Sequence, residues 1–505
     1  MNKSKSLLAL HFSKEAGITR QLTEAASIVP SERPARSFPD GFLFGTKSSA
    51  YQTEGSVTAE GRGVSIWDTY SHRPGATHNG DTGDITSDHY RHLEEDLDLL
   101  AELGTPVYCF SVAWPRIQPA GSGPANQPGL DFYRRLVDGL LRRGIAPAVT
   151  LHHWDVPQPL QDRGGWTVRD TVGRFADYTA LVATALGTDV ALWMTINEPW
   201  CPSWLGYANG QHAPGHHDLG EAAAATHHLL LAHGESVRVL RATLPGAQVG
   251  LSLLLQPVRP ASDHEDDRTV ARLVDGNINR LFLDPIVQGS YPADMLEHYA
   301  GHEPGFSVVA DGDLAIIAEP LDFLGVNYYA PKTVCSVSRM AEARTAGYWV
   351  PAAGPADLLN ADLGAVEVHR ADAPRTRMGW EIDPTGLTEL LVRLRHDYTL
   401  PPIYITENGA ACDDYVDPDG QVHDGDRISY LDEHLRVVLD AIDDGNDIRG
   451  YFVWSLLDNF EWAEGFQKRF GLIWIDYPSG RRIPKASFHW YRRTVRANAL
   501  IPDAG

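Results

Sequence analysis

The fold is decided by a helix–strand unit at residues 130–154, which read LDFYRRLVDGLLRRGIAPAVTLHHW. Apolar residues in the first part of this unit fall on one helix face, at Leu136, Val137, Leu140 and Leu141. Gly144 ends the helical pattern, and the short apolar run that follows, 145–151, is typical of a buried strand. The unit therefore predicts a helix of residues 130–143 that leads into a strand ending beside His152 and His153.

The same alternation of short apolar runs and helical patterns recurs along most of the chain. Seven more β-rich runs lie at 41–45, 106–110, 192–196, 248–255, 321–326, 402–406 and 448–452. Further helical patterns lie at 88–103, 170–186, 220–244, 383–398 and 428–443. Eight strands that alternate with helices predict an α/β fold, a single (β/α)8 TIM barrel. Extended βα loops are expected at 116–129 and 336–373.

Three regions are expected in the 505-residue chain. Residues 37–497 should form the barrel as one unit, because barrels of this kind often exceed the usual domain length. Residues 1–36 are expected to be a flexible N-terminal extension, since Pro30, Pro34 and polar neighbours interrupt any helix there. Residues 498–505 are expected to be a C-terminal tail.

Charge and cysteine content narrow the class of partner. The formal net charge of −23 predicts no nucleic-acid or anionic membrane partner, because both would repel the protein. No run approaches the ~18 consecutive apolar residues that a membrane helix needs, and the apolar run at 6–12 is short for a secretory signal. Widely spaced cysteines favour a cytoplasmic location over a disulfide framework or a thiolate metal site; they are Cys109, Cys201, Cys335 and Cys412. The chain could be a monomer or a homo-oligomer.

Polar and aromatic side chains follow the carboxyl ends of the predicted strands. In a parallel barrel these ends converge on one mouth, where catalytic groups lie. The residues concerned are Gln52, His153, Asn197, Glu198, Asn327, Tyr329, Glu407 and Trp454. Any one of them could be an ordinary loop residue, but their recurrence at the same end of successive strands indicates a shared pocket.

Two of these residues are carboxylates that directly follow an apolar strand, in TINEP at 195–199 and in ITENG at 405–409. The strands are the fourth and seventh, on opposite sides of the barrel, so Glu198 and Glu407 can flank a ligand. One carboxyl that protonates the leaving oxygen and one that attacks the anomeric carbon are the minimum for retaining glycoside hydrolysis. Tryptophans fit the same chemistry, because sugar rings stack on indole. They are Trp154, Trp193, Trp200, Trp204, Trp454, Trp462 and Trp474, of which Trp193 and Trp474 are interpreted as core residues.

From about residue 38 to residue 493 the chain resembles glycoside hydrolase family 1, the retaining β-glucosidase family. The matching segments run in family order and lie at 51–55, 82–84, 88–90, 111–116, 151–165, 195–199, 327–329, 405–409 and 454–471. The resemblance implies hydrolysis of terminal non-reducing β-D-glucosyl residues, with β-galactosyl or β-fucosyl residues as alternatives, through a covalent glycosyl-enzyme. It implies a small β-glucoside or oligosaccharide substrate, no cofactor, no metal, and carboxyl groups ~5 Å apart.

The resemblance also implies roles for individual residues. Glu198 is the acid/base and Glu407 the nucleophile, with Tyr329 hydrogen-bonded to the nucleophile. The remaining residues bind the sugar or line its site: Gln52, His153, Trp154, Asn197, Asn327, Trp454 as the stacking floor, Glu461, Trp462 as an indole donor, and Phe470 as a wall. The pair Glu461-Trp462 favours a neutral sugar over a phosphorylated one, because phosphoglycosidase relatives lack it.

Two residues depart from the family pattern. On the second strand the family carries Tyr-Arg-Phe-Ser, whereas this chain has Cys109 at the arginine position. Cys109 cannot supply the positive charge that holds a neighbouring nucleophile ionised. Lys47 lies in a first-strand segment where the family carries small residues. One hypothesis is that Lys47 partly replaces the missing charge near Glu407; the alternative is that it points outward between helices.

Two other functions on the same scaffold stay open at this point. A transglycosylating or tailoring glycosidase would pass the sugar to an alcohol instead of water, and product analysis with an added acceptor would reveal it. A catalytically weak sugar-binding homologue would explain Cys109, although the intact Glu198 and Glu407 argue against it. An assay with a nitrophenyl β-glucoside would distinguish this sugar-binding homologue from an active glycosidase.

Overall fold

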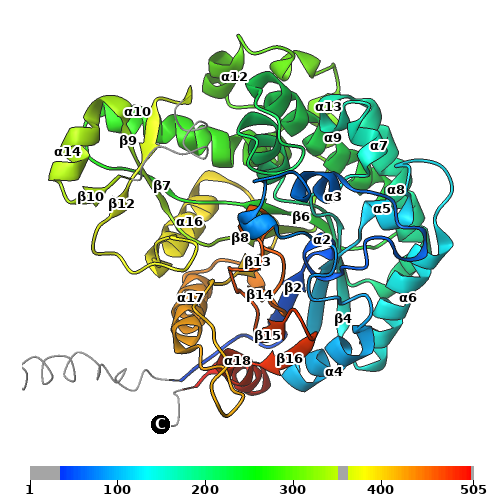
Figure 1. The fold of residues 1–505 in the computed structure, drawn as a ribbon. Coiled ribbons are helices and arrows are strands. Elements are labelled where there is room, and N and C mark those ends of the chain that lie inside the picture. The colour runs from blue at the N-terminus through cyan, green and yellow to red at the C-terminus, as the bar shows by residue number, and fades with distance from the viewer. Residues whose placement is uncertain (1–34, 351–361, 502–505) are drawn as a thin grey trace, which may run out of the picture.

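Eight parallel strands close into a barrel in the computed structural model, which describes residues 35–350 and 362–501 (Figure 1). Around the barrel the strands are β2 (Leu43–Ser48), β3 (Val107–Ser111), β4 (Ala146–His152), β5 (Leu192–Asn197), β6 (Val249–Leu254), β8 (Phe323–Asn327), β13 (Ile403–Asn408) and β14 (Ile448–Trp454). Each corresponds to one of the predicted strands, and β14 pairs with β2 to close the ring. The predicted (β/α)8 barrel is confirmed.

Helices surround the strands, as the sequence predicts (Figure 1). The six predicted helices appear as α4 (Leu93–Leu103), α6 (Gln127–Arg142), α8 (Asp170–Leu186), α9 (Leu219–Thr243), α16 (Pro384–Asp397) and α17 (Gly425–Asp443). Helix α4 begins five residues after the predicted start at 88, because Asp88 has a φ of +50°, which no α-helix accommodates. The helix α18 (Ala486–Ala497), which follows β14, was not predicted.

The long loop expected at 336–373 contains secondary structure, so this expectation was wrong for its described part. β11 (Ala365–Glu367) pairs with β9 (Lys332–Ser336), which pairs with β7 (Val258–Pro260) outside the barrel. The same segment contains helix α14 (Met340–Thr345) and two strands that pair with each other, β10 (Tyr348–Trp349) and β12 (His369–Arg370). These strands are too short for an apolar alternation to be recognised in the sequence. The shorter loop expected at 116–129 overlaps the start of α6.

A compact cluster fills the barrel below its mouth. It consists of buried side chains from β3, β4, β5, β8, β13 and β14, namely Val107, Cys109, Ala148, Leu192, Met194, Phe323, Tyr404 and Phe452. Because this cluster is packed, a ligand can enter the barrel only from the carboxyl ends of the strands. The polar residues at the carboxyl ends of the strands therefore lie directly above this packed cluster, which we call the floor of the barrel.

The two ends of the described chain pair with each other. β1 (Arg36–Ser37) forms an antiparallel pair with β17 (Ala499–Leu500), in which Arg36 faces Leu500. This pairing joins Arg36, expected in the extension, to residues 499–500, expected in the tail. The expected flexibility of the extension concerns residues 1–34, which lie outside the described residues.

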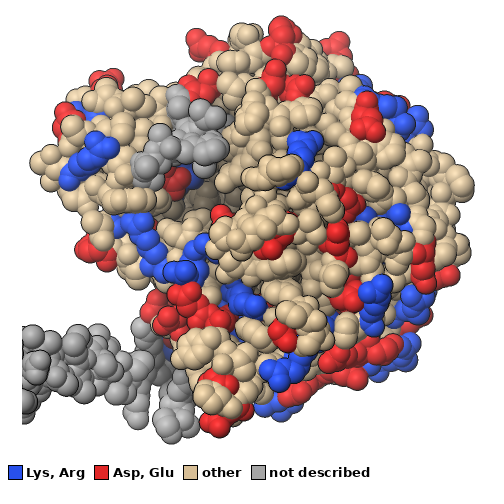
Figure 2. Space-filling view, in the orientation of Figure 1, with Lys and Arg blue, Asp and Glu red and all other residues tan. Residues whose placement is uncertain are grey.

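Basic and acidic side chains are intermixed on the face seen in Figure 2. Several arginines on the helices that cover the barrel lie beside carboxylates; Arg143, for example, contacts Glu94 at 2.9 Å and Asp98 at 2.6 Å. Within residues 35–350 and 362–501, no helix combines the length and apolar character needed to cross a membrane.

Truncation of the barrel floor should destabilise the protein strongly. Phe452 is fully buried in the floor, so Phe452→Ala should cost about 3–5 kcal/mol of unfolding free energy. Val392→Ala on α16 is the control, because Val392 is 48 % exposed and its truncation should change stability by no more than about 0.5 kcal/mol. Denaturant and thermal midpoints measure both; equal shifts in the two variants would contradict this account of the floor.

Candidate active site

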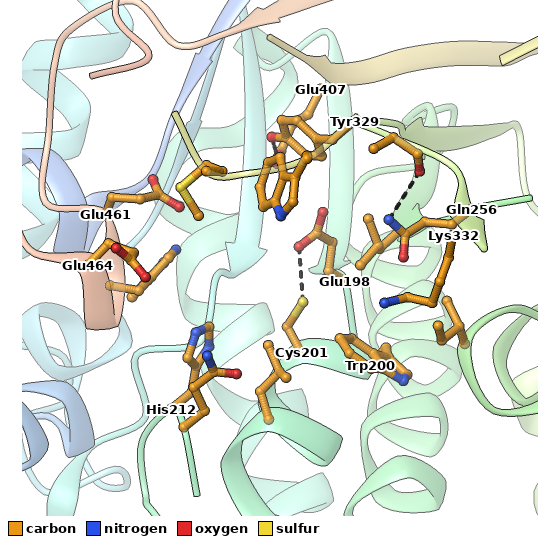
Figure 3. Close-up of a pocket in the computed structure, with 18 of the residues that line it drawn as sticks. Glu198, Trp200, Cys201, His212, Gln256, Tyr329, Lys332, Glu407, Glu461 and Glu464 are labelled. Carbon is orange, nitrogen blue, oxygen red and sulfur yellow. Dashed lines mark hydrogen bonds between the residues drawn. The ribbon is translucent and has the colours of Figure 1, made fainter. Parts of the chain in front are cut away.

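A pocket of about 420 Å³ opens at the carboxyl ends of the barrel strands (Figure 3). Side chains that follow five of the eight strands line its inner part. They are His153 and Trp154 after β4, Glu198 after β5, Tyr329 after β8, Glu407 in β13 and Trp454 in β14, joined by Glu461, Trp462 and Phe470 from the following loop. The barrel thus brings together residues that lie up to 317 positions apart in the sequence, 153 to 470.

Glu198 is held at the pocket wall by contacts on its backbone and on both carboxyl oxygens. Its backbone N–H donates to the Ser252 carbonyl oxygen at 2.8 Å. Asn327 Nδ2 donates to Oε1 at 2.8 Å. The Cys201 thiol donates to Oε2 at 3.3 Å (Figure 3). The backbone of Glu198 has a φ of +47°, a left-handed conformation that is uncommon for a non-glycine residue and that occurs often at functional sites.

Burial and a neighbouring charge raise the pKa of Glu198 to about 8. Burial disfavours the charged form, and the negative charge of Glu407 acts in the same direction. The hydrogen bonds from Asn327 and Cys201 stabilise the carboxylate and oppose this rise. Glu198 is therefore protonated at neutral pH while it remains able to lose that proton.

Glu407 is held by a tyrosine and a lysine. The Tyr329 hydroxyl donates to Oε2 at 2.6 Å, and Lys47 Nζ lies 2.9 Å from Oε1. Burial and the charge of Glu407 raise the pKa of Tyr329 well above its usual value, so this phenol stays a proton donor. One oxygen of Glu407 thus accepts a hydrogen bond from Tyr329, and the other forms an ion pair with Lys47.

Lys47 points into the barrel, not outward between helices. Its side chain is fully buried, and besides Glu407 its ammonium donates to Asn197 Oδ1 at 2.6 Å. Cys109 is its register partner on β3. Burial raises the pKa of the Cys109 thiol to about 11, so this side chain is neutral at pH 7.

Four other polar residues at the pocket form two hydrogen-bonded pairs. Glu461 accepts a hydrogen bond from Gln52 Nε2 at 3.3 Å, and burial, followed by the charge of Glu407, raises the pKa of Glu461 to about 8. His153 Nε2 lies 3.3 Å from Asn197 Nδ2. Burial and the charge of Lys47 hold the pKa of His153 well below its usual value, so its imidazole is neutral.

Aromatic side chains form the remaining walls. The rings of Trp154 and Trp462 are 4.4 Å apart, and the ring of His153 stacks on that of Trp454 at 5.7 Å. Phe470 packs edge-on against Tyr329, with ring centroids 6.2 Å apart. Trp154 and Trp462 have φ values of +80° and +49°, so strained backbone occurs on this wall as it does at Glu198.

The sequence-predicted residues fall into two layers. Nine of them line the pocket: His153, Trp154, Glu198, Tyr329, Glu407, Trp454, Glu461, Trp462 and Phe470. Gln52, Asn197, Asn327, Lys47 and Cys109 lie directly behind, and the first four hydrogen-bond to or form ion pairs with lining residues. Trp204, expected near the mouth, does not line the pocket and packs on Tyr299 instead. Trp193 and Trp474, interpreted as core residues, do not line it either, and Trp193 is buried.

Sequence reasoning missed several residues of the pocket. Cys201 follows Glu198 by three positions, a spacing that brings its thiol back to the carboxylate and that could have identified it. The outer part of the pocket is lined by Gln256, Lys332, Glu367, His369, Met378 and Trp380, and no motif marks them. Lys332 forms an ion pair with Glu367 there. Among the described residues, no group of three or more His, Cys, Asp or Glu side chains is arranged to hold a metal ion.

Comparison with known proteins agrees with this geometry. Residues 35–500 match the model of glycosyl hydrolase family 1. The chain is 49 % identical to thermostable beta-glucosidase B of Thermobispora bispora, over 92 % of each chain. It is 46 % identical to the bifunctional beta-D-glucosidase/beta-D-fucosidase of Bifidobacterium breve, over 91 % of this chain and 98 % of that one.

Among solved structures, the family 1 β-glucosidase of Thermotoga maritima in complex with isofagomine lactam superimposes with a TM-score of 0.84 at 42 % identity. The match covers 92 % of this chain and all of that one. Sequence and fold agree, and the chain belongs to glycosyl hydrolase family 1.

Proposed function

We propose that this enzyme is a retaining β-glucosidase that hydrolyses terminal non-reducing β-D-glucosyl residues. The observation that carries the proposal is that Glu198 and Glu407 line one pocket, in which Glu407 forms an ion pair with Lys47 while burial and the charge of Glu407 raise the pKa of Glu198. The names of two relatives support glucose as the sugar that is released: one is a β-glucosidase and the other is a bifunctional β-D-glucosidase/β-D-fucosidase.

In the first step, Glu407 attacks the anomeric carbon while Glu198 gives its proton to the leaving oxygen. Glu407 must be ionised to attack, and the ammonium of Lys47 at 2.9 Å and the hydroxyl of Tyr329 at 2.6 Å both stabilise its carboxylate. Glu198 must start protonated, which its raised pKa of about 8 supports at neutral pH. The product of this step is a glycosyl ester on Glu407.

In the second step, water replaces the leaving group and Glu198 acts as a base. Formation of the ester removes the negative charge of Glu407, which is the second-largest cause of the raised pKa of Glu198. The pKa of Glu198 therefore falls when the intermediate forms, and the same carboxyl becomes able to accept a proton from water.

For sugar binding, we propose that the polar residues hold the hydroxyls and the aromatic residues stack on the ring. The candidates for hydroxyl binding are Gln52, His153, Asn197 and Glu461, which already form two hydrogen-bonded pairs. Trp454 would be the floor under the ring, with Trp154, Trp462, Phe470 and Asn327 around it. Such a site accepts a neutral hexose, and glucose, galactose and fucose differ too little to be separated by these contacts.

The substrate we propose is a small β-glucoside or oligosaccharide whose aglycone lies in the outer pocket. We also propose a cytoplasmic location, supported by free thiols at Cys109, Cys201, Cys335 and Cys412. Subcellular fractionation of the native host would test that location.

The stereochemistry of the first product tests the mechanism. With nitrophenyl β-D-glucoside, proton NMR should detect β-glucose first, because two displacements retain configuration. Glu407→Ala should reduce turnover to background, and Glu198→Ala should slow it by about 10²–10⁴-fold. Added azide should give the α-glucosyl azide with Glu407→Ala and the β-glucosyl azide with Glu198→Ala.

The control for these variants is Glu297→Ala, which removes an exposed carboxylate on α12 (Ala293–Tyr299) and should keep wild-type turnover. Initial release of α-glucose, or near wild-type turnover in either active-site variant, would contradict the proposal.

The alkaline limb of the pH profile should depend on Cys201. Activity is lost as pH rises through the pKa of Glu198, because the acid form protonates the leaving group. Cys201→Ala removes a hydrogen bond that lowers this pKa, so the alkaline limb of kcat/KM should move to higher pH. Cys201→Ser keeps a donor and should leave the limb at or below its wild-type position. A limb that does not move in Cys201→Ala would show that the thiol has no influence on Glu198.

A further inference from the structure

We infer that Lys47 and Cys109 form an interdependent pair, in which one buried positive charge serves Glu407 from β2 while the neighbouring position on β3 has to stay uncharged. The inference rests on the proposed role of Glu407 as the nucleophile. It makes Lys47 a positioning residue that acts through its contacts with Glu407 and Asn197.

The position of Lys47 makes its pairing with Glu407 obligatory. It lies in β2 between Trp454 of β14 and Cys109 of β3 in the strand register. Its side chain crosses the barrel interior to Glu407 on β13 and Asn197 on β5, and it is fully buried. A buried ammonium without partners is very costly, so the folded state keeps Lys47 in contact with a carboxylate.

The surroundings of Glu407 are otherwise negative or neutral. The titratable groups around it are Lys47 from β2, Cys109 from β3, Glu198 and Cys201 after β5, Tyr329 after β8 and Glu461 after β14. Among the described residues, Lys47 is the only lysine or arginine that forms an ion pair with Glu407. Without it, the Glu407 carboxylate would face two other carboxyl groups with only the Tyr329 hydroxyl to stabilise it.

Cys109 fits the neighbouring position because it is small and uncharged. Its thiol contacts Thr150 Oγ1 at 3.6 Å, and Cys109 lies directly beside Lys47 in the strand register, so the two side chains start from the same level of the barrel. A cation at this position would lie beside the Lys47 ammonium in an interior with little water, where like charges repel strongly. The site therefore has room for one positive charge, on either β2 or β3.

Lys47 also orients the amide of Asn197. The Asn197 oxygen accepts from Lys47 at 2.6 Å and from Asn327 Nδ2 at 3.2 Å. Both contacts fix the oxygen toward the barrel interior and turn the Asn197 NH2 group toward His153, which lines the pocket. Loss of Lys47 should therefore weaken substrate binding as well as the chemical step.

The test is a double-variant cycle with Lys47→Met, Cys109→Arg and the combined protein, measured by the pH dependence of kcat/KM and by thermal midpoints. Methionine keeps the volume of the lysine chain but has no charge. Lys47→Met should lower kcat/KM on the order of 10²-fold and move the acid limb to higher pH by about one unit or more. Loss of the Lys47–Asn197 contact should raise KM as well.

Cys109→Arg alone should lower both the thermal midpoint and activity, because it adds a second buried cation beside Lys47. In the combined variant the guanidinium replaces the missing charge, so kcat/KM should recover at least about tenfold relative to Lys47→Met, and the acid limb should return toward lower pH. A merely structural role for Lys47 would give no such recovery from a residue on another strand. Lys332→Met is the matched control, since this pocket lysine pairs with Glu367 and its loss should not move the acid limb.

An acid limb unchanged in Lys47→Met would overturn the inference, as would a folded combined variant no more active than Lys47→Met. Should the combined variant not fold, the profile of Lys47→Met alone decides. The proposed function fails by a different result, namely no glycosidase activity in the wild type or retained activity in Glu407→Ala.

Discussion

The site depends on the electrostatic balance between carboxyl groups that share one buried pocket with a single buried lysine. Burial and the negative charge of Glu407 raise the pKa values of both Glu198 and Glu461. Lys47 contacts Glu407 and neither of the others, which favours ionisation at Glu407. This ion pair therefore distinguishes Glu407 from the two other glutamates of the pocket.

The barrel supplies the geometry for this balance. Strands β2, β5, β8 and β13 contribute Lys47, Asn197, Asn327 and Glu407, and these side chains contact one another or Glu198 across the interior. The packed floor beneath them keeps the site at the carboxyl ends of the strands. A substitution in the floor therefore threatens the alignment of the site as well as the stability of the fold.

The sequence allowed most of this arrangement to be predicted, because apolar strands and the residues that end them are local signals. All eight barrel strands were predicted, and Glu198 and Glu407 were expected to share a pocket because each follows a strand end. The direction of the Lys47 side chain could not be predicted, since it depends on strand register and on which partner compensates its charge. The short strands β10, β11 and β12 were missed because they are two or three residues long and owe their form to pairing with distant segments. Cys201 was missed although its position three residues after Glu198 could have indicated the contact between its thiol and the carboxylate.

The most direct test of the central claim is to trap the covalent intermediate. A 2-deoxy-2-fluoro-β-glucosyl donor with a good leaving group destabilises the oxocarbenium-like transition states of both steps, so the ester should accumulate once the leaving group has gone. Mass spectrometry of the digested protein should find one fluoroglucosyl group, on the peptide that contains Glu407. A label on a different residue, or complete turnover of the donor with no labelled peptide, would contradict the assignment of Glu407 as the nucleophile.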